Sequence, residues 1–249
     1  MTEKHTNGSL ARIIAHRGAS GEAPENTLAA MSLAYEQGAK CVEIDVSISR
    51  DGVPYVHHDD NLDRCTSGTG LLCEHMAEEL DELDASKLMP VYSPEALPRL
   101  SALIAVLDHL ELGLNLEIKP RKGLEEATVE AICKLLENCW PQRLPLVFSS
   151  FSQQSLDIAR RRSPDIARAL LVDKLPGNWL TSVQTFECCN LHARASSLQQ
   201  QDVIDVKQQG FNLYAYTVND EALAAKLSQW GVDGVFTDYP GRLLKSLPS

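Results

Sequence analysis

The stretch VEIDVSISRDGVPYVHHDD, residues 42–60, contains two alternating apolar and polar segments separated by Asp51-Gly52. Alternation with a period of two is typical of a β-strand with one buried face. Asp-Gly between two such segments favours a two-residue hairpin loop of type I′. The sequence therefore predicts two antiparallel strands here, with Arg50 directly opposite Val53.

The pairing of this hairpin also predicts which polar side chains share a face. With that loop, Asp45 lies opposite His58, and directly opposed residues place their Cβ atoms about 5 Å apart on one face. Glu43, two residues before Asp45, points the same way. His57 is predicted to point to the other face, so His58 is the histidine expected beside the two carboxylates.

Short apolar, β-branched runs alternate with helical patterns through almost the whole sequence. Eight runs have strand character: residues 12–16, 41–46, 114–118, 144–150, 167–172, 187–192, 212–218 and 234–237. Asn26, Ser152 and Asn219 are placed to cap three of the helices between them. Alternating β and α units imply a parallel sheet, and eight units in 249 residues match a TIM (β/α)8 barrel. A doubly wound open sheet is the alternative, but the glycine-rich first turn of a dinucleotide-binding fold is missing.

Residues 60–97 interrupt this rhythm, because a connection of that length is too long for an ordinary barrel loop. We interpret the segment as an insertion or lid that follows the hairpin and lies over one end of the barrel. The whole chain, residues 1–249, is then predicted to be a single domain with this insertion.

Composition limits the partners of the protein. The formal net charge of −11 argues against a general binder of nucleic acid or anionic membranes, since both attract basic surfaces. The seven cysteines show no C-x-x-C spacing, so neither a zinc cluster nor a disulfide framework is indicated. Residues 1–12 lack the apolar region of a signal peptide, and no apolar run approaches the length of a membrane span. These features predict a cytoplasmic protein that acts on a small molecule without stable membrane anchoring.

Ionisable side chains gather where a barrel would have its active site, at the carboxyl ends of the strands. Three consecutive predicted strands, with the hairpin, bring together His16, Arg17, Glu43, Asp45, His58, Glu117 and Lys119. Three converging carboxylates predict a hard divalent cation with oxygen ligands. A guanidinium and an ammonium group suit the binding of phosphate, and histidines suit proton transfer near neutral pH.

Other interpretations of single residues remain open. Arg17 could instead form an ion pair with Glu25. Lys119 could form the Schiff base of an aldolase, although flanking carboxylates would keep its amine charged. Asp59 and Arg64 are more typical of groups that anchor the insertion than of catalysts. Five side chains at later strand ends could line a substrate pocket or be structural: Ser150, Phe151, Asn190, His192 and Tyr216.

The sequence resembles the glycerophosphodiester phosphodiesterase family. The resemblance is carried, in order, by IIAHRGASGEAPENT, VEIDVSISRDGVPYVHHDDNLDRCTSGTG, LNLEIKP, YTVN and GVFTDYP, and runs from about residue 13 to residue 243. The His-Arg-Gly and Glu-x-Asp pieces are weak signals singly, but their order and spacing together are specific. The resemblance implies a TIM barrel with a segment inserted after the His-Asp motif, which is the region 60–97.

The resemblance also implies roles for the residues at the rim. Glu43, Asp45 and Glu117 would hold Mg²⁺ or Ca²⁺, and His16 and His58 would form an acid–base pair, by analogy with His16 as base and His58 as acid. The implied reaction is metal-dependent hydrolysis of a glycerophosphodiester to sn-glycerol 3-phosphate and an alcohol. The attacking oxygen is either water or the glycerol 2-hydroxyl.

Substrate contacts are expected from Arg17 and Lys119 on the phosphate and from Phe151 and Tyr216 in the pocket. Tyr216 stands where family members usually have tryptophan before Thr-Val-Asn, which is a departure at the glycerol pocket. Two other functions fit part of this pattern. A phosphodiesterase acting on lysophospholipids needs an apolar channel, which the charged segment 60–97 does not indicate. A non-catalytic barrel that binds phosphodiesters should have lost a metal ligand or a histidine.

Overall fold

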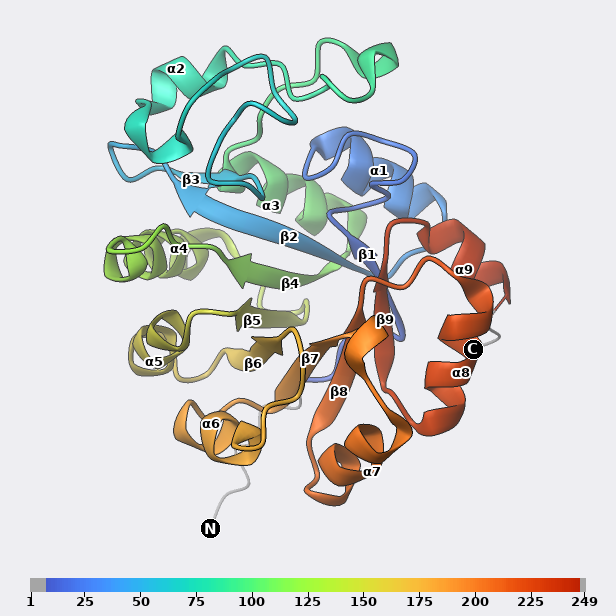
Figure 1. The fold of residues 1–249 in the computed structure, drawn as a ribbon. Coiled ribbons are helices and arrows are strands. Elements are labelled where there is room, and N and C mark those ends of the chain that lie inside the picture. The colour runs from blue at the N-terminus through green and yellow to red at the C-terminus, as the bar shows by residue number, and fades with distance from the viewer. Residues whose placement is uncertain (1–7, 247–249) are drawn as a thin grey trace.

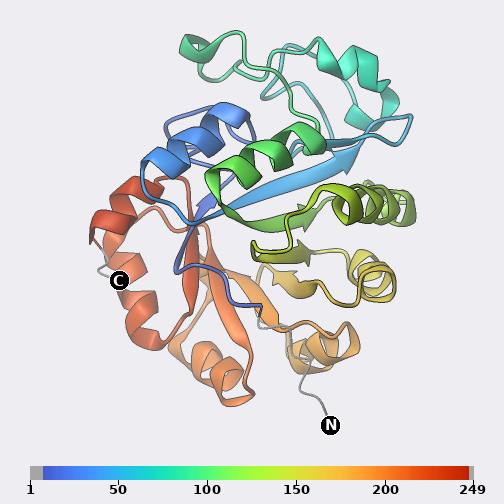
Figure 2. The same cartoon turned by 180° about the vertical axis from the view of Figure 1, so that it is seen from behind.

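The computed structural model describes residues 8–246, and within them eight parallel strands close into a barrel (Figures 1 and 2). The strands are β1 (Ile13–His16), β2 (Cys41–Ile48), β4 (Gly113–Ile118), β5 (Leu146–Ser150), β6 (Ala167–Val172), β7 (Asn190–Arg194), β8 (Asn212–Tyr216) and β9 (Gly234–Thr237). β1 pairs in parallel with both β2 and β9, so the first strand closes the sheet. The predicted TIM barrel is confirmed, and the doubly wound alternative, which has open edges, is wrong.

Helices surround the barrel, one after each of its strands. They are α1 (Leu28–Glu36), α3 (Leu100–Leu110), α4 (Glu125–Cys139), α5 (Gln153–Arg162), α6 (Trp179–Thr185), α7 (Gln200–Gln208), α8 (Glu221–Trp230) and α9 (Pro240–Ser246). Among the described residues, none of the helices combines the length and apolar composition that a membrane crossing requires.

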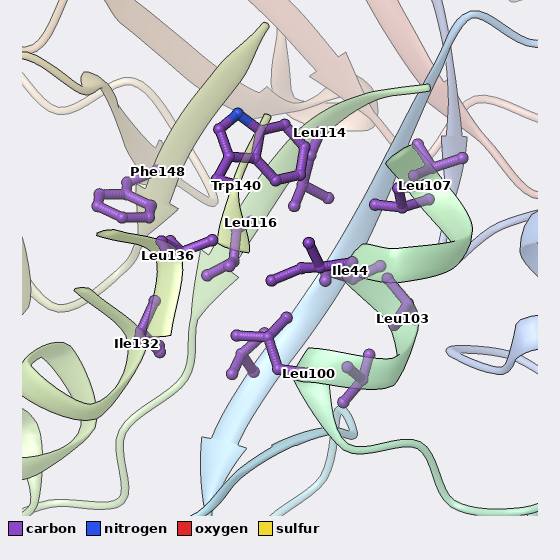
Figure 3. Packing of buried hydrophobic residues seen from close by; sticks show 14 of the residues in the cluster. Ile44, Leu100, Leu103, Leu107, Leu114, Leu116, Ile132, Leu136, Trp140 and Phe148 are labelled. Carbon is purple, nitrogen blue, oxygen red and sulfur yellow. The ribbon is translucent and has the colours of Figure 1, made fainter. Parts of the chain in front are cut away.

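The main core lies between the strands and the helices outside them (Figure 3). α3 contributes Leu100, Leu103 and Leu107, whose spacing places them on one face of the helix, toward Ile44 of β2. Strand side chains alternate, so the residues beside Ile44 point into the barrel instead. One of these neighbours is Glu43, and the same alternation that builds the core therefore delivers carboxylates to the interior.

The hairpin differs from its predicted form. β3 (Pro54–Val56) pairs with β2 one residue out of the predicted register, and the loop has three residues instead of two. The backbone N–H of Ser49 donates to the carbonyl of Val53 at 3.0 Å. Gly52 has a positive φ of 81° but Asp51 does not, whereas a type I′ turn needs positive φ at both. A turn that ends in a left-handed glycine fits this three-residue loop.

This register removes the parity argument for His58. Asp45 faces His57, whose N–H donates to the Asp45 carbonyl at 2.9 Å. The His57 ring is buried and lies 3.0 Å from the carbonyl oxygen of Asn61, away from the barrel. β3 ends at Val56, so strand alternation no longer governs the two histidines. His58 reaches the barrel because the chain turns after β3.

Two predicted helix caps have other partners. α1 is capped by Thr27, whose hydroxyl accepts from the backbone of the first turn, and α8 is capped by Asp220. Asn26 and Asn219 turn toward carboxylates at the rim of the barrel instead. Ser152 caps α5 as predicted.

Residues 60–97 connect β3 to α3 and lie beside the carboxyl end of β2 (Figure 1, teal to green). The segment contains α2 (Ala77–Asp81) and two short 3₁₀ turns, Leu72–Glu74 and Pro90–Tyr92. Buried residues of its own, including Leu62 and Leu80, form a separate small cluster against β3. Charged side chains join the segment to the loop before α1, as described below.

Candidate active site

A cavity of about 260 Å³ opens at the carboxyl ends of the strands. Eight of the nine residues predicted for the site line it: His16, Arg17, Glu43, His58, Glu117, Lys119, Phe151 and Tyr216. The ninth, Asp45, lies behind the wall with 1% of its surface exposed. Among the described residues, none from the segment 60–97 lines this cavity.

Three carboxylates converge on one side of the cavity. Glu43, Asp45 and Glu117 each offer an oxygen, and these oxygens lie within 4.8 Å of one another. β2 and β4 are neighbours in the barrel, with Asp45 directly beside Glu117, so strand register sets this convergence. All the donor atoms are hard oxygens, and hard divalent cations such as Mg²⁺ and Ca²⁺ bind to such a set.

Burial and mutual repulsion raise the pKa of two members of this cluster, whereas neighbouring cations lower that of the third. Burial, followed by the charges of Asp45 and Glu117, raises the pKa of Glu43 well above its ordinary value. Burial and the charge of Asp45 raise the pKa of Glu117 to about 7. Asp45 is also buried, but the charges of Arg17 and Lys119 outweigh burial and lower its pKa to about 2. Burial and like charges raise the pKa of a carboxyl group, whereas nearby cations lower it, so the pattern follows the distribution of charge around the cluster.

Asn26 supports the innermost carboxylate. Its side-chain N–H donates to Asp45 at 2.9 Å, and its own side-chain oxygen accepts from the Asp45 backbone N–H at 3.2 Å. Asn26 has φ of 61°, a left-handed conformation that asparagine adopts more readily than most residues. The sequence predicted Asn26 to be a helix cap and did not predict its contact with Asp45. The local motif Pro-Glu-Asn-Thr gives no reason to expect that contact.

His16 is oriented by a residue that follows the last strand. Its Nδ1 lies 2.7 Å from Asp238, which leaves Nε2 on the side of the cavity, 4.0 Å from Glu43. Asp238 also accepts hydrogen bonds from Ser20 at 3.0 Å and Asn219 at 2.6 Å. Burial alone would raise the pKa of Asp238, but these hydrogen bonds and the histidine lower it to about 2.

His58 also has a carboxylate partner. Its Nδ1 lies 2.6 Å from Asp59, the next residue in the sequence, so Nε2 is again the nitrogen left for the cavity. Asp59 in turn accepts from Arg64 at 2.6 Å. Burial lowers the pKa of His58, with the charges of Arg17 and Lys119 adding to the effect of burial and that of Asp45 opposing it.

Two cations lie among the carboxylates. The Arg17 guanidinium donates to Glu25 at 2.8 Å and lies 3.1 Å from Asp45, so the ion pair with Glu25 that we considered from the sequence is present. Lys119 Nζ lies 3.2 Å from Glu117 and 3.7 Å from Asp45. Burial opposes its charge, but these carboxylates raise the pKa of Lys119, which disfavours the neutral amine that a Schiff base requires.

Aromatic side chains form the outer wall of the cavity. Phe151 is 46% exposed and contacts Tyr216 edge to face, with ring centroids 6.1 Å apart. The Tyr216 hydroxyl donates to the carbonyl of Val172 at 2.9 Å, which fixes the ring. Arg194, at the end of β7, lies 5.8 Å from the same ring and was not expected from the sequence.

The other residues considered at later strand ends differ in position. β7 begins three residues later than predicted, so His192 lies in the barrel interior, fully buried, at the inner end of the cavity. Ser150 bonds the carbonyl of Ile118, and Asn190 bonds that of Gly8; neither lines the cavity. Asp238 was missed, although it stands within the quoted motif GVFTDYP.

Comparison with known proteins adds to this geometry. Residues 16–242 match the model of the glycerophosphoryl diester phosphodiesterase family. A glycerophosphodiester phosphodiesterase from Caldanaerobacter subterraneus is 32% identical over 238 residues, covering 93% of this chain and 96% of the relative. A phosphodiesterase from Oleispira antarctica, solved in complex with the product sn-glycerol-3-phosphate, is 45% identical with a TM-score of 0.95, covering 96% of this chain and 98% of that one.

The chain belongs to the glycerophosphoryl diester phosphodiesterase family. It is an enzyme of the phosphoric diester hydrolase class, a glycerophosphodiester phosphodiesterase. A glycerophosphodiesterase of Bacillus subtilis, 31% identical over 245 residues and covering 91% of this chain and 83% of the relative, agrees with this assignment.

Proposed function

We propose that this enzyme hydrolyses glycerophosphodiesters to sn-glycerol 3-phosphate and an alcohol, using a divalent cation together with His16 and His58. The observation that carries the proposal is a cluster of three carboxylate oxygens within 4.8 Å of one another, at a cavity that His16 and His58 both line. The product bound by the Oleispira antarctica relative supports the same substrate class.

Glu43, Asp45 and Glu117 would hold the cation. Their all-oxygen donor set suits either Mg²⁺ or Ca²⁺. The raised pKa values of the two glutamates reflect burial and, after it, neighbouring negative charge, which a cation would relieve. When bound, such an ion polarises phosphoryl oxygens and stabilises charge that develops on them. Arg17 and Lys119 would contact the phosphate from the same wall, since both line the cavity.

His16 and His58 would carry the protons. One accepts the proton of the attacking oxygen, from water or from the glycerol 2-hydroxyl, while the other donates a proton to the leaving alcohol. The resemblance assigns His16 as base and His58 as acid. Burial lowers the pKa of His58, but this direction does not by itself assign either role, so kinetics must separate the two orders.

A choice of leaving group separates the two orders. A p-nitrophenyl leaving group departs without a proton, so loss of the acid should cost little with a glycerophospho-p-nitrophenyl substrate and much with glycerophosphocholine. Loss of the base should cost the same with both. Measuring kcat for His16→Ala and His58→Ala on the two substrates therefore assigns the roles.

The remaining substrate contacts concern Phe151 and Tyr216, which we propose cover the glyceryl group. We also propose a reducing, cytoplasmic setting, which seven unpaired cysteines in the described part of the chain support. Ionisable side chains make up much of the wall of this cavity of about 260 Å³, so a lysophospholipid substrate with its long acyl chain is not favoured.

The first experiment measures release of sn-glycerol 3-phosphate from glycerophosphocholine with Mg²⁺ or Ca²⁺ and then with excess EDTA. We expect turnover that EDTA abolishes and that His58→Ala lowers by about 10²- to 10⁴-fold. Turnover that persists fully in EDTA would contradict the metal. A folded His58→Ala variant with wild-type kcat would contradict the proton-transfer role.

A further inference from the structure

We propose that Arg64, a residue of the segment 60–97, is a positioning residue that holds His58 and Arg17 in one geometry, and this proposal depends on the function proposed above. Arg64 does not line the cavity and touches no group that would react. It acts on the site through two carboxylates, Asp59 and Glu25, each of which holds one residue of the cavity wall.

The contacts form an unbroken chain between two residues that line the cavity, His58 and Arg17. Arg64 Nε donates to Asp59 at 2.6 Å, and Asp59 lies 2.6 Å from Nδ1 of His58. In the other direction, Arg64 Nη1 and Nη2 donate to the two oxygens of Glu25 at 2.7 and 2.8 Å. Glu25 Oε1 then accepts from Arg17 at 2.8 Å.

Arg64 suits this position because a guanidinium can bind two carboxylates with separate edges. Its side chain is 41% exposed, and a surface ion pair of that kind contributes little to stability by itself. The carboxylates that it joins are less exposed, at 27% for Asp59 and 17% for Glu25. The geometry therefore favours an effect on the arrangement of the site over an effect on folding.

Loss of Arg64 should change two kinetic quantities at once. Asp59 loses the cation that fixes it, so the His58 ring becomes less restrained and kcat falls. Glu25 keeps Arg17 as its cationic partner and holds it more tightly, so Arg17 is less available to phosphate and KM rises. A group that only anchored the segment would not be expected to affect both.

Arg99 supplies a matched control. Its side chain is 40% exposed and donates two hydrogen bonds to Asp81, an aspartate of the segment 60–97. Arg99 contacts neither the cavity residues nor their carboxylate partners among the described residues. Arg64→Ala and Arg99→Ala thus remove comparable ion pairs from the segment, of which only the first reaches the site.

The test measures kcat and KM for glycerophosphocholine in the wild type, Arg64→Ala, Arg64→Lys and Arg99→Ala. We expect Arg64→Ala to lower kcat/KM about 10²-fold with both parameters affected, and Arg99→Ala to change it less than threefold. Arg64→Lys should lose about tenfold, because an ammonium cannot fork to both carboxylates. Free guanidinium, at concentrations that leave the melting temperature unchanged, should restore part of the activity of Arg64→Ala and none in Arg99→Ala.

Equal losses in Arg64→Ala and Arg99→Ala, or a folded Arg64→Ala with the kcat and KM of the wild type, would overturn the coupling in favour of simple anchoring. If Arg64→Ala does not fold, Arg64→Lys with kinetics equal to the wild type would overturn it as well. An inactive wild type would instead count against the proposed function, so the two failures are distinguishable.

Discussion

His16 and His58 both place Nδ1 against an aspartate, at 2.7 and 2.6 Å, but the two aspartates come from very different parts of the molecule. Asp238 lies 222 residues along the chain from His16 and is reached only because β1 and β9 meet. Asp59 is the next residue after His58 and relies on Arg64, in the segment beside the barrel.

The partners of the two aspartates also differ in charge. Asp238 accepts from neutral groups, Ser20 and Asn219, in addition to the histidine. Asp59 accepts from a guanidinium instead. The barrel therefore fixes one histidine through its closure, whereas a surface ion network fixes the other. The contacts of Asp59 can change without altering the barrel. Substitutions at Asp59 and at Asp238 should therefore differ in how much activity they remove.

The largest expected effect comes from the barrel side. Asp238→Asn keeps the shape of the side chain but removes the charge that fixes the His16 tautomer, and we expect kcat to fall by about 10²- to 10⁴-fold. The measurement is kcat for glycerophosphocholine, with the melting temperature as the control for folding. A folded variant that loses less than about tenfold would show that His16 does not depend on its aspartate.

A smaller effect is expected from Asp59→Asn. His58 is more exposed than His16, at 31% against 18%, so water can replace part of the lost contact. We expect kcat to fall by about 10- to 10²-fold, measured beside Asp238→Asn under the same conditions. If Asp59→Asn proves the more damaging of the two, the surface network restrains its histidine more strongly than barrel closure does.

The barrel could be predicted from the sequence because the pattern of a strand followed by a helix is repeated eight times. The residues that orient the side chains of the site depend on single contacts, which no repeated pattern indicates. Apolar alternation placed Glu43 and Glu117 inside the strands, and β2 and β4 are neighbours as the predicted order required. No local pattern paired His16 with Asp238, since that contact depends on closure over 222 residues. The predicted hairpin register was wrong because the loop has one residue more than predicted. One added loop residue shifts every pair of residues along the two strands.

A third histidine sharpens the comparison, because His192 is fully buried without a hydrogen-bond partner for either ring nitrogen among the described residues. Burial lowers its pKa to about 3, from an ordinary value of 6.5. Below pH 6.5, His192 binds a proton in the unfolded chain but not in the folded protein. The free energy of unfolding therefore falls as pH falls. Between pH 6.5 and 5 this should cost about 2 kcal/mol.

Urea unfolding of the wild type and His192→Phe at both pH values isolates this contribution. The phenylalanine variant should lose less stability over the same interval, because the group that titrates on unfolding is gone. Rings of Tyr214 and Phe236 already pack against His192, so an apolar ring suits the position. Parallel pH dependence in the two proteins would show that His192 titrates alike in the folded and unfolded states.

The smallest effect is expected from Ser20→Ala, which removes one neutral donor from Asp238 and leaves Asn219 in place. A single neutral hydrogen bond contributes about 0.5–1.5 kcal/mol, so kcat should fall by no more than about tenfold. The readout is kcat for glycerophosphocholine beside Asp238→Asn. A loss as large as that of Asp238→Asn would mean that the hydroxyl, and not the carboxylate, controls His16.

If His16 acts as proposed, its contact with Asp238 also makes activity depend on the order of folding. A chain that has emerged only as far as β8 can form most of the sheet, but His16 has no carboxylate at Nδ1 until the final strand docks against the first. Contacts this distant in sequence carry a high loop-closure cost and tend to form late. On the proposed role of His16, we expect full activity only when the ring of strands is complete, so the rate at which activity returns after dilution from denaturant should report that last step.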